Sequence, residues 1–252
     1  MCVIVYKPGG VKFPPNEDLE LMYAANDDGI GLMFAYKGRV YGKKFKQFKV
    51  FKEELDSLPR ALPVMMHFRW ATHGGNEITH AQPFPFPTTK ESVYSLEWSS
   101  LMGIMHNGTI SGFGDDMSNR LTVWRRIAGG TFVEVTRPEQ KLSDTQEFLL
   151  FISSDKELTR QFTSLDRGLL KLIYKLSSSK FGLLVGTGKA RLVGKWEQKK
   201  GLWYSNMLWT YYRQYYEDNW TKEGYSNGRE EKNWQEIWNS VPSPPYRGHF
   251  IG

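Results

Sequence analysis

Cys2 is the residue of this 252-residue chain best suited by type and position to nucleophilic chemistry, and it is the single cysteine. If Met1 is removed, Cys2 carries both a thiol and a free α-amine, and the amine can serve as the base that activates the thiol. Because the ordinary pKa of an α-amine is about 7.7 to 8.0, a useful fraction is neutral at physiological pH and can accept the thiol proton. A cysteine by itself is more often a small buried hydrophobe, so Cys2 needs supporting residues elsewhere.

Three further polar blocks follow along the chain. They are HFRWATHGG at residues 67–75, HNGTI at residues 106–110 and SDTQE at residues 143–147. Together with Cys2, and in this order, they resemble the class II glutamine amidotransferase family over roughly residues 2–205. The block at residues 67–75 is most similar to the amidotransferase half of glucosamine-phosphate synthase.

This resemblance implies a glutamine amide hydrolase with Cys2 as its nucleophile. The thiol would attack the side-chain amide to give a glutamyl thioester and ammonia, and water would then release glutamate. The resemblance also implies that the amide of Asn107 and the backbone N–H of Gly108 stabilise the oxyanion, where one donor typically contributes about 2.7 to 4 kcal/mol. An Asn-Gly pair alone is a common turn, so this role depends on the neighbouring blocks.

Arg69 and Asp144 are the expected contacts to the two charged groups of free glutamine. The guanidinium fork can bind an α-carboxylate through two hydrogen bonds, and a carboxylate can accept from an α-ammonium. The resemblance adds Trp70, Thr72 and His73 as further substrate-binding residues. The simpler interpretations are a surface ion pair for Arg69 and a helix-dipole residue for Asp144.

The sequence predicts neither a metal nor a cofactor. The histidines at positions 67, 73, 80 and 106 have neither the helical i, i+4 spacing nor a common zinc pattern, and no second cysteine is present. Residues 186–189 (GTGK) are too short for a phosphate-binding loop and are predicted to form a turn.

The composition is typical of a folded protein, with 40% hydrophobic and 15% aromatic residues. One cysteine excludes an internal disulfide and favours a reducing compartment. No apolar run is long enough for a membrane helix and the first residues lack a signal-peptide pattern, so we expect a cytoplasmic protein with no membrane contact. The net charge of +6 is compatible with an acidic partner or with ordinary solubility.

A basic segment between Lys37 and Lys52 contains no acidic residue and is interspersed with aromatic side chains. Such a segment can bind single-stranded nucleic acid. We favour a hairpin whose aromatic side chains face the core while its lysines face water.

The elements that must position these residues are predicted from periodicity, turns and caps. Strands are predicted at residues 3–6, 30–36, 39–51, 64–69, 100–106, 181–185, 190–196 and 202–205. Helices are predicted at residues 17–25, 53–58 and 118–126. A capping box at Ser143 and Gln146 predicts the start of a further helix, and apolar spacing predicts one long amphipathic helix over residues 158–176.

These elements alone predict mixed α and β structure, and the resemblance implies an α+β fold. This is the four-layer αββα sandwich of N-terminal-nucleophile hydrolases, with two mostly antiparallel sheets. We expect an amidotransferase domain at residues 1–209, and at residues 210–252 an aromatic-rich tail that packs on the domain or on a partner. Because that tail is too short for a synthase domain, ammonia is expected to pass to a separate synthase chain.

Two other functions fit parts of the pattern. Another N-terminal-nucleophile acylase or peptidase would keep Cys2 and Asn107 but would have no use for Arg69 and Asp144. An inactive scaffold would bind nucleic acid through the Lys37–Lys52 segment, with a strong dependence on salt.

Overall fold

The structure is a computed structural model that describes residues 2–71, 77–114 and 142–211. The chain divides into two compact units, Met1–Thr210 and Tyr211–Gly252. All helices and strands named below belong to the first unit. The helix predicted at residues 118–126 and almost all of the tail lie outside the described residues.

The first unit contains two β-sheets. The larger has the order β10-β11-β1-β4-β2-β3-β6 and the smaller the order β5-β7-β8-β9, with antiparallel pairing at every recorded pair of strands. The strands of the larger sheet are β1 (Val3–Lys7), β2 (Ile30–Tyr36), β3 (Arg39–Phe45), β4 (Val64–Phe68), β6 (Glu97–Ser100), β10 (Glu197–Lys199) and β11 (Leu202–Tyr204). Those of the smaller sheet are β5 (Phe84–Phe86), β7 (Met102–Asn107), β8 (Lys180–Val185) and β9 (Ala190–Val193).

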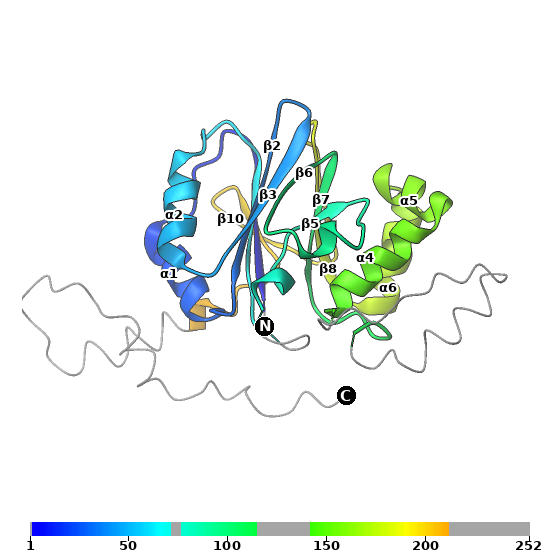
Figure 1. Cartoon of the computed structure of the whole chain (residues 1–252). Helices are drawn as coiled ribbons and strands as arrows, with labels where there is room; N and C mark the ends of the chain where they lie inside the picture. The colour runs from blue at the N-terminus through cyan, green and yellow to red at the C-terminus, as the bar shows by residue number, and fades with distance from the viewer. Residues whose placement is uncertain (1, 72–76, 115–141, 212–252) are drawn as a thin grey trace, which may run out of the picture. The chain divides into compact units, whose positions relative to one another are not determined.

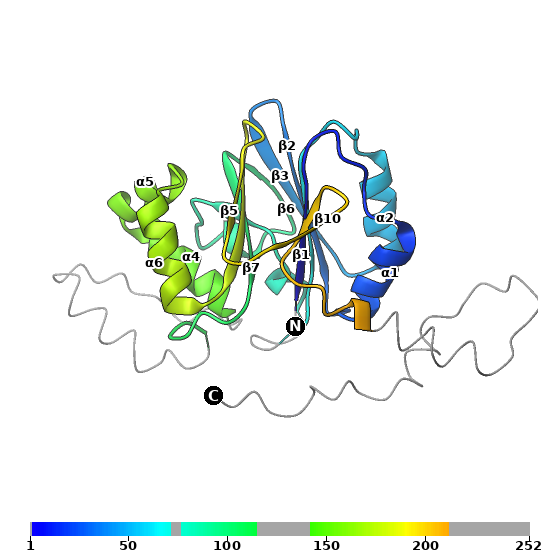
Figure 2. The same cartoon turned by 180° about the vertical axis from the view of Figure 1, so that it is seen from behind.

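Helices cover the outer face of each sheet. In Figure 1, α1 (Asn16–Ala24) and α2 (Phe48–Ser57) lie beside the larger sheet, and α4 (Asp144–Ser154), α5 (Lys156–Thr163) and α6 (Arg167–Ser177) lie beside the smaller one. Two short 3-10 helices, η1 (Ile78–His80) and η2 (Ser92–Tyr94), connect strands. Seen from behind in Figure 2, the same four layers are evident. The predicted α+β fold, with two antiparallel sheets between helical layers, is confirmed.

Two apolar cores hold these layers together. One lies between the sheets and joins side chains of β1, β2, β3 and β4 to side chains of β7 and β8. The other fills the space between the smaller sheet and α4, α5 and α6. Glycine permits the close approach of the sheets: a Cβ on Gly103 would lie 2.7 Å from Met33 Sδ and 2.7 Å from the Trp98 ring.

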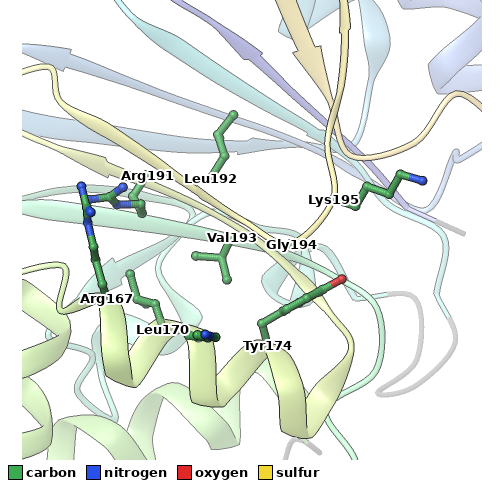
Figure 3. Close-up of a pocket in the computed structure, with 9 residues that line it drawn as sticks. Arg167, Leu170, Tyr174, Arg191, Leu192, Val193, Gly194 and Lys195 are labelled. Carbon is green, nitrogen blue, oxygen red and sulfur yellow. The ribbon is translucent and has the colours of Figure 1, made fainter.

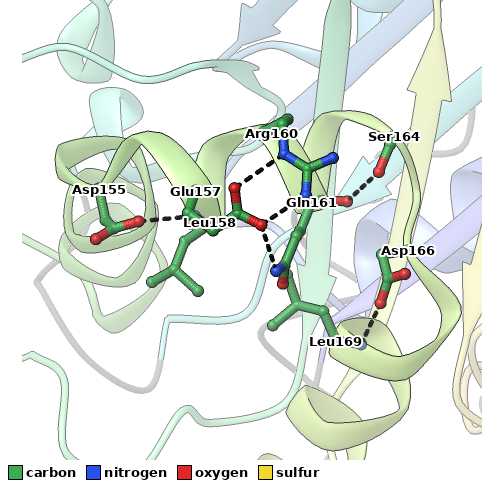
Figure 4. Close-up of polar contacts among 8 residues, drawn as sticks. All are labelled: Asp155, Glu157, Leu158, Arg160, Gln161, Ser164, Asp166 and Leu169. Carbon is green, nitrogen blue, oxygen red and sulfur yellow. Dashed lines mark hydrogen bonds and ion pairs between the residues drawn. The ribbon is translucent and has the colours of Figure 1, made fainter.

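The helices over the smaller sheet begin at side-chain caps. The predicted capping box is present at α4, where Gln146 N donates to Ser143 Oγ and Ser143 N donates to Gln146 Oε1 at 2.8 Å. Figure 4 shows the caps of α5 and α6, where Asp155 and Asp166 each accept a backbone N–H at 2.8 Å. These bonds satisfy donors that an α-helix leaves unpaired at its start.

The strand predicted at residues 39–51 is wrong in its second half. The strand β3 ends at Phe45, and α2 begins at Phe48. The helical turn carries Phe51 and Leu55, four residues apart, into the core. Lys44 also departs from the expected solvated face, because it is buried and its Nζ donates to the Thr79 carbonyl at 2.8 Å.

The single helix predicted at residues 158–176 is two helices. The first, α5, ends at Thr163, Leu165 adopts a left-handed φ of 58°, and Asp166 caps α6. Apolar residues on both sides of this break pack on the same core, so the apolar spacing continues although the helix does not. Within the described residues, no helix is both long and apolar enough to cross a membrane.

Candidate active site

A cavity of about 30 Å³ lies where β1 begins and where β4 and β7 end, beside the first turn of α4. Its lining consists of Cys2, His67, Arg69, Trp70, His80, Gln82, His106, Gly108, Ser143, Asp144 and Thr145. Five of the site residues predicted from the sequence are therefore together: Cys2, Arg69, Trp70, Gly108 and Asp144. This volume has room for water but not for a whole amino acid, so glutamine could enter only if lining side chains shift.

Cys2 lies directly before β1 and is held by backbone and side-chain contacts. Its Sγ accepts a hydrogen bond from Trp70 N at 3.3 Å and lies 3.4 Å from the Trp70 carbonyl. Its own carbonyl accepts a bond from Asn206 Nδ2 at 2.8 Å. Burial raises the pKa of the Cys2 thiol, while the Trp70 N–H, the positive chain terminus and Arg69 act in the opposite direction.

Arg69 is brought beside Cys2 by strand register. Val3 pairs with Phe68 in the antiparallel β1–β4 ladder. Continuing this register by one residue places Arg69, which follows β4, opposite Cys2, which precedes β1. Burial lowers the pKa of Arg69, and the negative charges of Cys2, Asp28 and Asp144 oppose that shift. Asp28 was not predicted from the sequence; its carboxylate accepts the Ala71 N–H at 2.6 Å and so fixes the chain just after Arg69.

Asp144 is the first residue of α4 and is buried. One carboxylate oxygen accepts the Ile110 N–H at 2.8 Å, and the other accepts the Thr145 N–H at 2.7 Å. A helix N-terminus favours a negative charge at this position. Since an ionised carboxylate has about four lone-pair sites, Asp144 retains capacity for a further donor such as an ammonium group.

Asn107 ends β7 and is buried, but it does not line the cavity. Its Nδ2 donates to Ser205 Oγ at 2.8 Å, and the same oxygen accepts the Ile4 N–H at 2.9 Å. A single oxygen therefore ties the predicted oxyanion donor to the strand that begins after Cys2. Ser205 and Asn206 carried no recognisable signal in the sequence.

Gly108 lies on the cavity wall with a φ of 138°, in a region that favours glycine. A Cβ at this position would lie 2.5 Å from Ser179 Oγ. Both observations explain why glycine follows Asn107. The role of the Gly108 backbone N–H as an oxyanion donor stays a prediction.

A buried polar network in the cavity wall joins the loop before β5 to β7 and to the first turn of α4. Gln82 Oε1 accepts the His106 N–H, and His106 Nδ1 lies 2.9 Å from Thr145 Oγ1. Gly31 of β2 makes room for this link, because a Cβ there would lie 1.3 Å from the Gln82 carbonyl oxygen. Gln82 therefore helps to position His106 at the cavity wall.

Two histidines of the cavity, His67 and His106, have lowered pKa values. Burial lowers the pKa of His67 to about 3, with the charge of Arg69 acting in the same direction, and lowers that of His106 to about 4. Within residues 2–71, 77–114 and 142–211, no group of three or more His, Cys, Asp or Glu side chains is arranged to hold a metal ion. Thr72 and His73 fall between the described ranges, so their roles stay predictions.

Comparison with known proteins gives a distant structural likeness. No family model matches the chain, and no curated protein matches it. Among solved structures it is similar to a glutamine aminotransferase class-II domain protein from Silicibacter pomeroyi, with 13% identity, a TM-score of 0.37, and coverage of 81% of this chain and 87% of that one. A likeness this distant does not assign a function, and none of these comparisons gives a link to glucosamine-phosphate synthase.

Proposed function

We propose that this protein hydrolyses the side-chain amide of free glutamine, with Cys2 as nucleophile, and releases glutamate and ammonia. The observation that carries the proposal is the single cavity shared by the Cys2 thiol, the Arg69 guanidinium and the Asp144 carboxylate. A thiol beside one cation and one anion suits a substrate whose amide must reach sulfur while both of its charged ends are held. The distant structural likeness adds no weight.

In the proposed reaction, the α-amine of a processed Cys2 accepts the thiol proton and Sγ attacks the amide carbon. The oxyanion that forms accepts hydrogen bonds from the Gly108 N–H and from the second hydrogen of the Asn107 amide, which must come to face the cavity when the lining shifts to admit glutamine. The protonated amine then donates to the departing nitrogen, which leaves as ammonia. Water attacks the resulting thioester, the amine takes its proton, and the thiol is restored as glutamate departs.

Free glutamine is favoured over other amides because both ends of an amino acid have a matching group. Arg69 supplies a fork for the α-carboxylate, and Asp144 supplies remaining lone pairs for the α-ammonium. An N-acylated substrate keeps its α-carboxylate for Arg69 but leaves the buried carboxylate of Asp144 unpaired, which would weaken binding. An acylase or peptidase with the same fold would instead bind acylated substrates without this loss of affinity.

The test combines intact mass with a glutamate-release assay on protein from which Met1 has been removed. We expect hydrolysis of glutamine, undetectable hydrolysis by Cys2→Ala at equal concentration, and strongly reduced hydrolysis of N-acetylglutamine. Protein that retains Met1 is the matched control, because it keeps the thiol but blocks the α-amine. Turnover that is equal in the Cys2→Ala variant, or faster on the acetylated substrate, would rule out the proposal.

We further propose that the ammonia is used by a separate acceptor enzyme. Deleting residues 211–252 should leave glutaminase activity intact while abolishing co-purification with the acceptor chain. Co-purification that persists after the deletion would exclude the tail as the docking segment.

A further inference from the structure

A second, larger cavity of about 370 Å³ lies between α6 and β9. It shares no lining residue with the cavity of Cys2. Because β9 is the last strand of the smaller sheet, one wall is formed by a sheet edge and the other by a helix. Its volume is within the range of about 300 to 1,000 Å³ typical of small-molecule sites.

The rim of this cavity is strongly basic. Arg167 and Lys171 contribute from α6, Arg191 contributes from β9, and Lys195 follows that strand, while no acidic residue lines the cavity. Figure 3 shows the side chains of Arg167 and Arg191 ending at the same side of it. Like charges that converge in this way are favourable when a bound anion lies between them.

These cations lack protein counter-ions over the described ranges. There, none of the four makes an ion pair or a side-chain hydrogen bond with another described residue. The contrast is Arg160 of the neighbouring helix, whose guanidinium is paired with Glu157 at 2.6 Å (Figure 4). Asp166, next in sequence to Arg167, has a carboxylate oxygen committed to the cap of α6.

Arg191 gives a second, independent indication of a ligand. Its Nε is buried and has no hydrogen-bond partner among the described residues, which is unfavourable for a donor removed from water. Because Nε is buried, a phosphate oxygen reaches it only when the Arg191 side chain shifts, and the guanidinium then presents paired donors in the geometry that phosphate accepts. The structure thus leaves a charged donor unsatisfied at the wall of a basic cavity.

The remaining wall is apolar. Leu170 and Val193 are buried, Leu192 is half-buried, and the ring of Tyr174 lies along the helix side of the cavity (Figure 3). Free inorganic phosphate would leave this apolar surface exposed to water. A ligand that fits both parts carries a phosphate at one end and a flat or apolar body at the other.

We propose that the α6–β9 cavity binds a small phosphomonoester with a planar body, of the nucleoside monophosphate class. The phosphate is held by Arg167 and Arg191, with Lys171 and Lys195 adding positive charge, and the planar body lies against Leu170, Leu192 and the Tyr174 ring. An extended nucleic acid is disfavoured because the four cations gather around one cavity of about 370 Å³ rather than along a track.

Calorimetric titration of the full chain with AMP tests the proposal. Adenosine and inorganic phosphate, the two parts of AMP, are titrated separately for comparison. We expect AMP to bind more tightly than either half. The Arg167→Gln and Arg191→Gln variants should each weaken AMP binding by about tenfold or more, the loss typical of one charge-assisted contact. Thermal unfolding of each variant confirms that the fold is retained.

Lys175→Gln is the matched control, because it removes one positive charge from an exposed position on the same helix that does not line the cavity. Its AMP affinity should equal that of the unaltered chain. The proposal is overturned if AMP does not bind, if Lys175→Gln loses as much affinity as Arg191→Gln, or if a single-stranded oligonucleotide binds more tightly than AMP. Glutamine hydrolysis is measured separately, so either proposal can fail alone.

Discussion

Cys2 is positioned from two directions, by the second residue after β4 and by the residues after β11. Trp70 contacts the thiol through its backbone, and Asn206 contacts the carbonyl of the same residue. Ser205, fully buried, bonds both to Ile4 and to the amide of Asn107. The nucleophile and the oxyanion donor therefore share one support, although they come from opposite sheets.

Ser205 is expected to act on catalysis through Asn107. Its hydroxyl oxygen fixes one amide hydrogen of Asn107 and leaves the other for the oxyanion. Ser205→Ala should therefore lower kcat on the order of tenfold, less than the roughly 100- to 1,000-fold expected for loss of a donor, and should leave KM nearly unchanged. Steady-state kinetics with glutamine measure this split.

A double-mutant cycle separates this positioning role from general destabilisation. If Ser205 acts through Asn107, the pair Ser205→Ala with Asn107→Ala should lose no more activity than Asn107→Ala alone. Ser100→Ala is the control, since it removes a hydroxyl that bonds only the Phe86 carbonyl, away from the cavity. Fully additive losses in the cycle would show that Ser205 has only a structural role.

The sequence predicted the reactive and charged groups of the site, but it did not predict the residues that hold those groups in position. Cys2, Arg69 and Asp144 belong to short blocks with distinctive composition, and strand register brings them together. Ser205 and Asn206 act through one buried oxygen and one amide, and a serine followed by asparagine after a strand has no distinctive pattern. Such supports become visible only when the antiparallel partner of β1 is known.

At the scale of elements, α4 matters because its first residue is Asp144. The capping box fixes where this helix starts, and Gln146 extends the connection by donating to the Val93 carbonyl at 3.1 Å. Gln146 is fully buried but does not line the cavity. Any effect of Gln146 on substrate binding must therefore be transmitted through the position of the helix.

Gln146→Ala is expected to destabilise the protein and to raise KM for glutamine. The substitution leaves the Ser143 N–H without its partner, which costs about 1 to 3 kcal/mol for a buried donor. It also releases the start of α4, so Asp144 should hold the α-ammonium less well. Chemical denaturation and steady-state kinetics on the same samples measure both effects.

Asp155→Ala provides a control of comparable destabilisation. It removes the cap of α5, which costs about 1 kcal/mol, on a helix without a predicted site residue. Its KM for glutamine should be unchanged. An equal rise of KM in both variants would mean that loss of stability alone, rather than the position of α4, impairs binding.

The elements were predicted correctly where local signals and tertiary packing agree, as at the capping box of α4 and the β8–β9 hairpin. The predictions were wrong where one pattern of apolar residues is compatible with two different secondary structures. Residues 158–176 keep helical spacing across a break that is set by Leu165 and the new cap at Asp166. Residues 39–51 alternate basic and aromatic side chains, a pattern typical of a strand, yet packing favours α2 after Phe48.

For the whole molecule, the region where the two sheets meet contains buried bases that the fold keeps neutral or weakly basic. Burial lowers the pKa of Lys44 to about 7, with Arg69 acting in the same direction, and its Nζ lies 4.2 Å from the Phe84 ring centroid. Together with His67 and His106, this lysine limits the positive charge around Arg69. Arg69 is thereby left as the principal cation of the cavity for a carboxylate.

The depressed histidine pKa values predict how global stability depends on pH. Unfolded histidine has a pKa of about 6.5, whereas in the folded protein that of His67 is about 3 and that of His106 about 4. Between pH 6.5 and 4 the unfolded chain therefore binds more protons at these positions than the folded protein does. The free energy of unfolding should accordingly fall as the pH is lowered, by about 1.4 kcal/mol per pH unit for each histidine once the unfolded side chain is protonated.

Urea denaturation at several pH values between 5 and 6.5 measures this slope in a range where most carboxylates are still ionised. His67→Gln replaces a titrating ring by an amide that stays neutral, so the variant should lose the share of the slope due to one histidine while keeping that of His106. Its absolute stability is not the readout, because the substitution also changes packing. A slope identical to that of the unaltered protein would mean that His67 binds its proton equally in both states and that the fold does not hold it neutral.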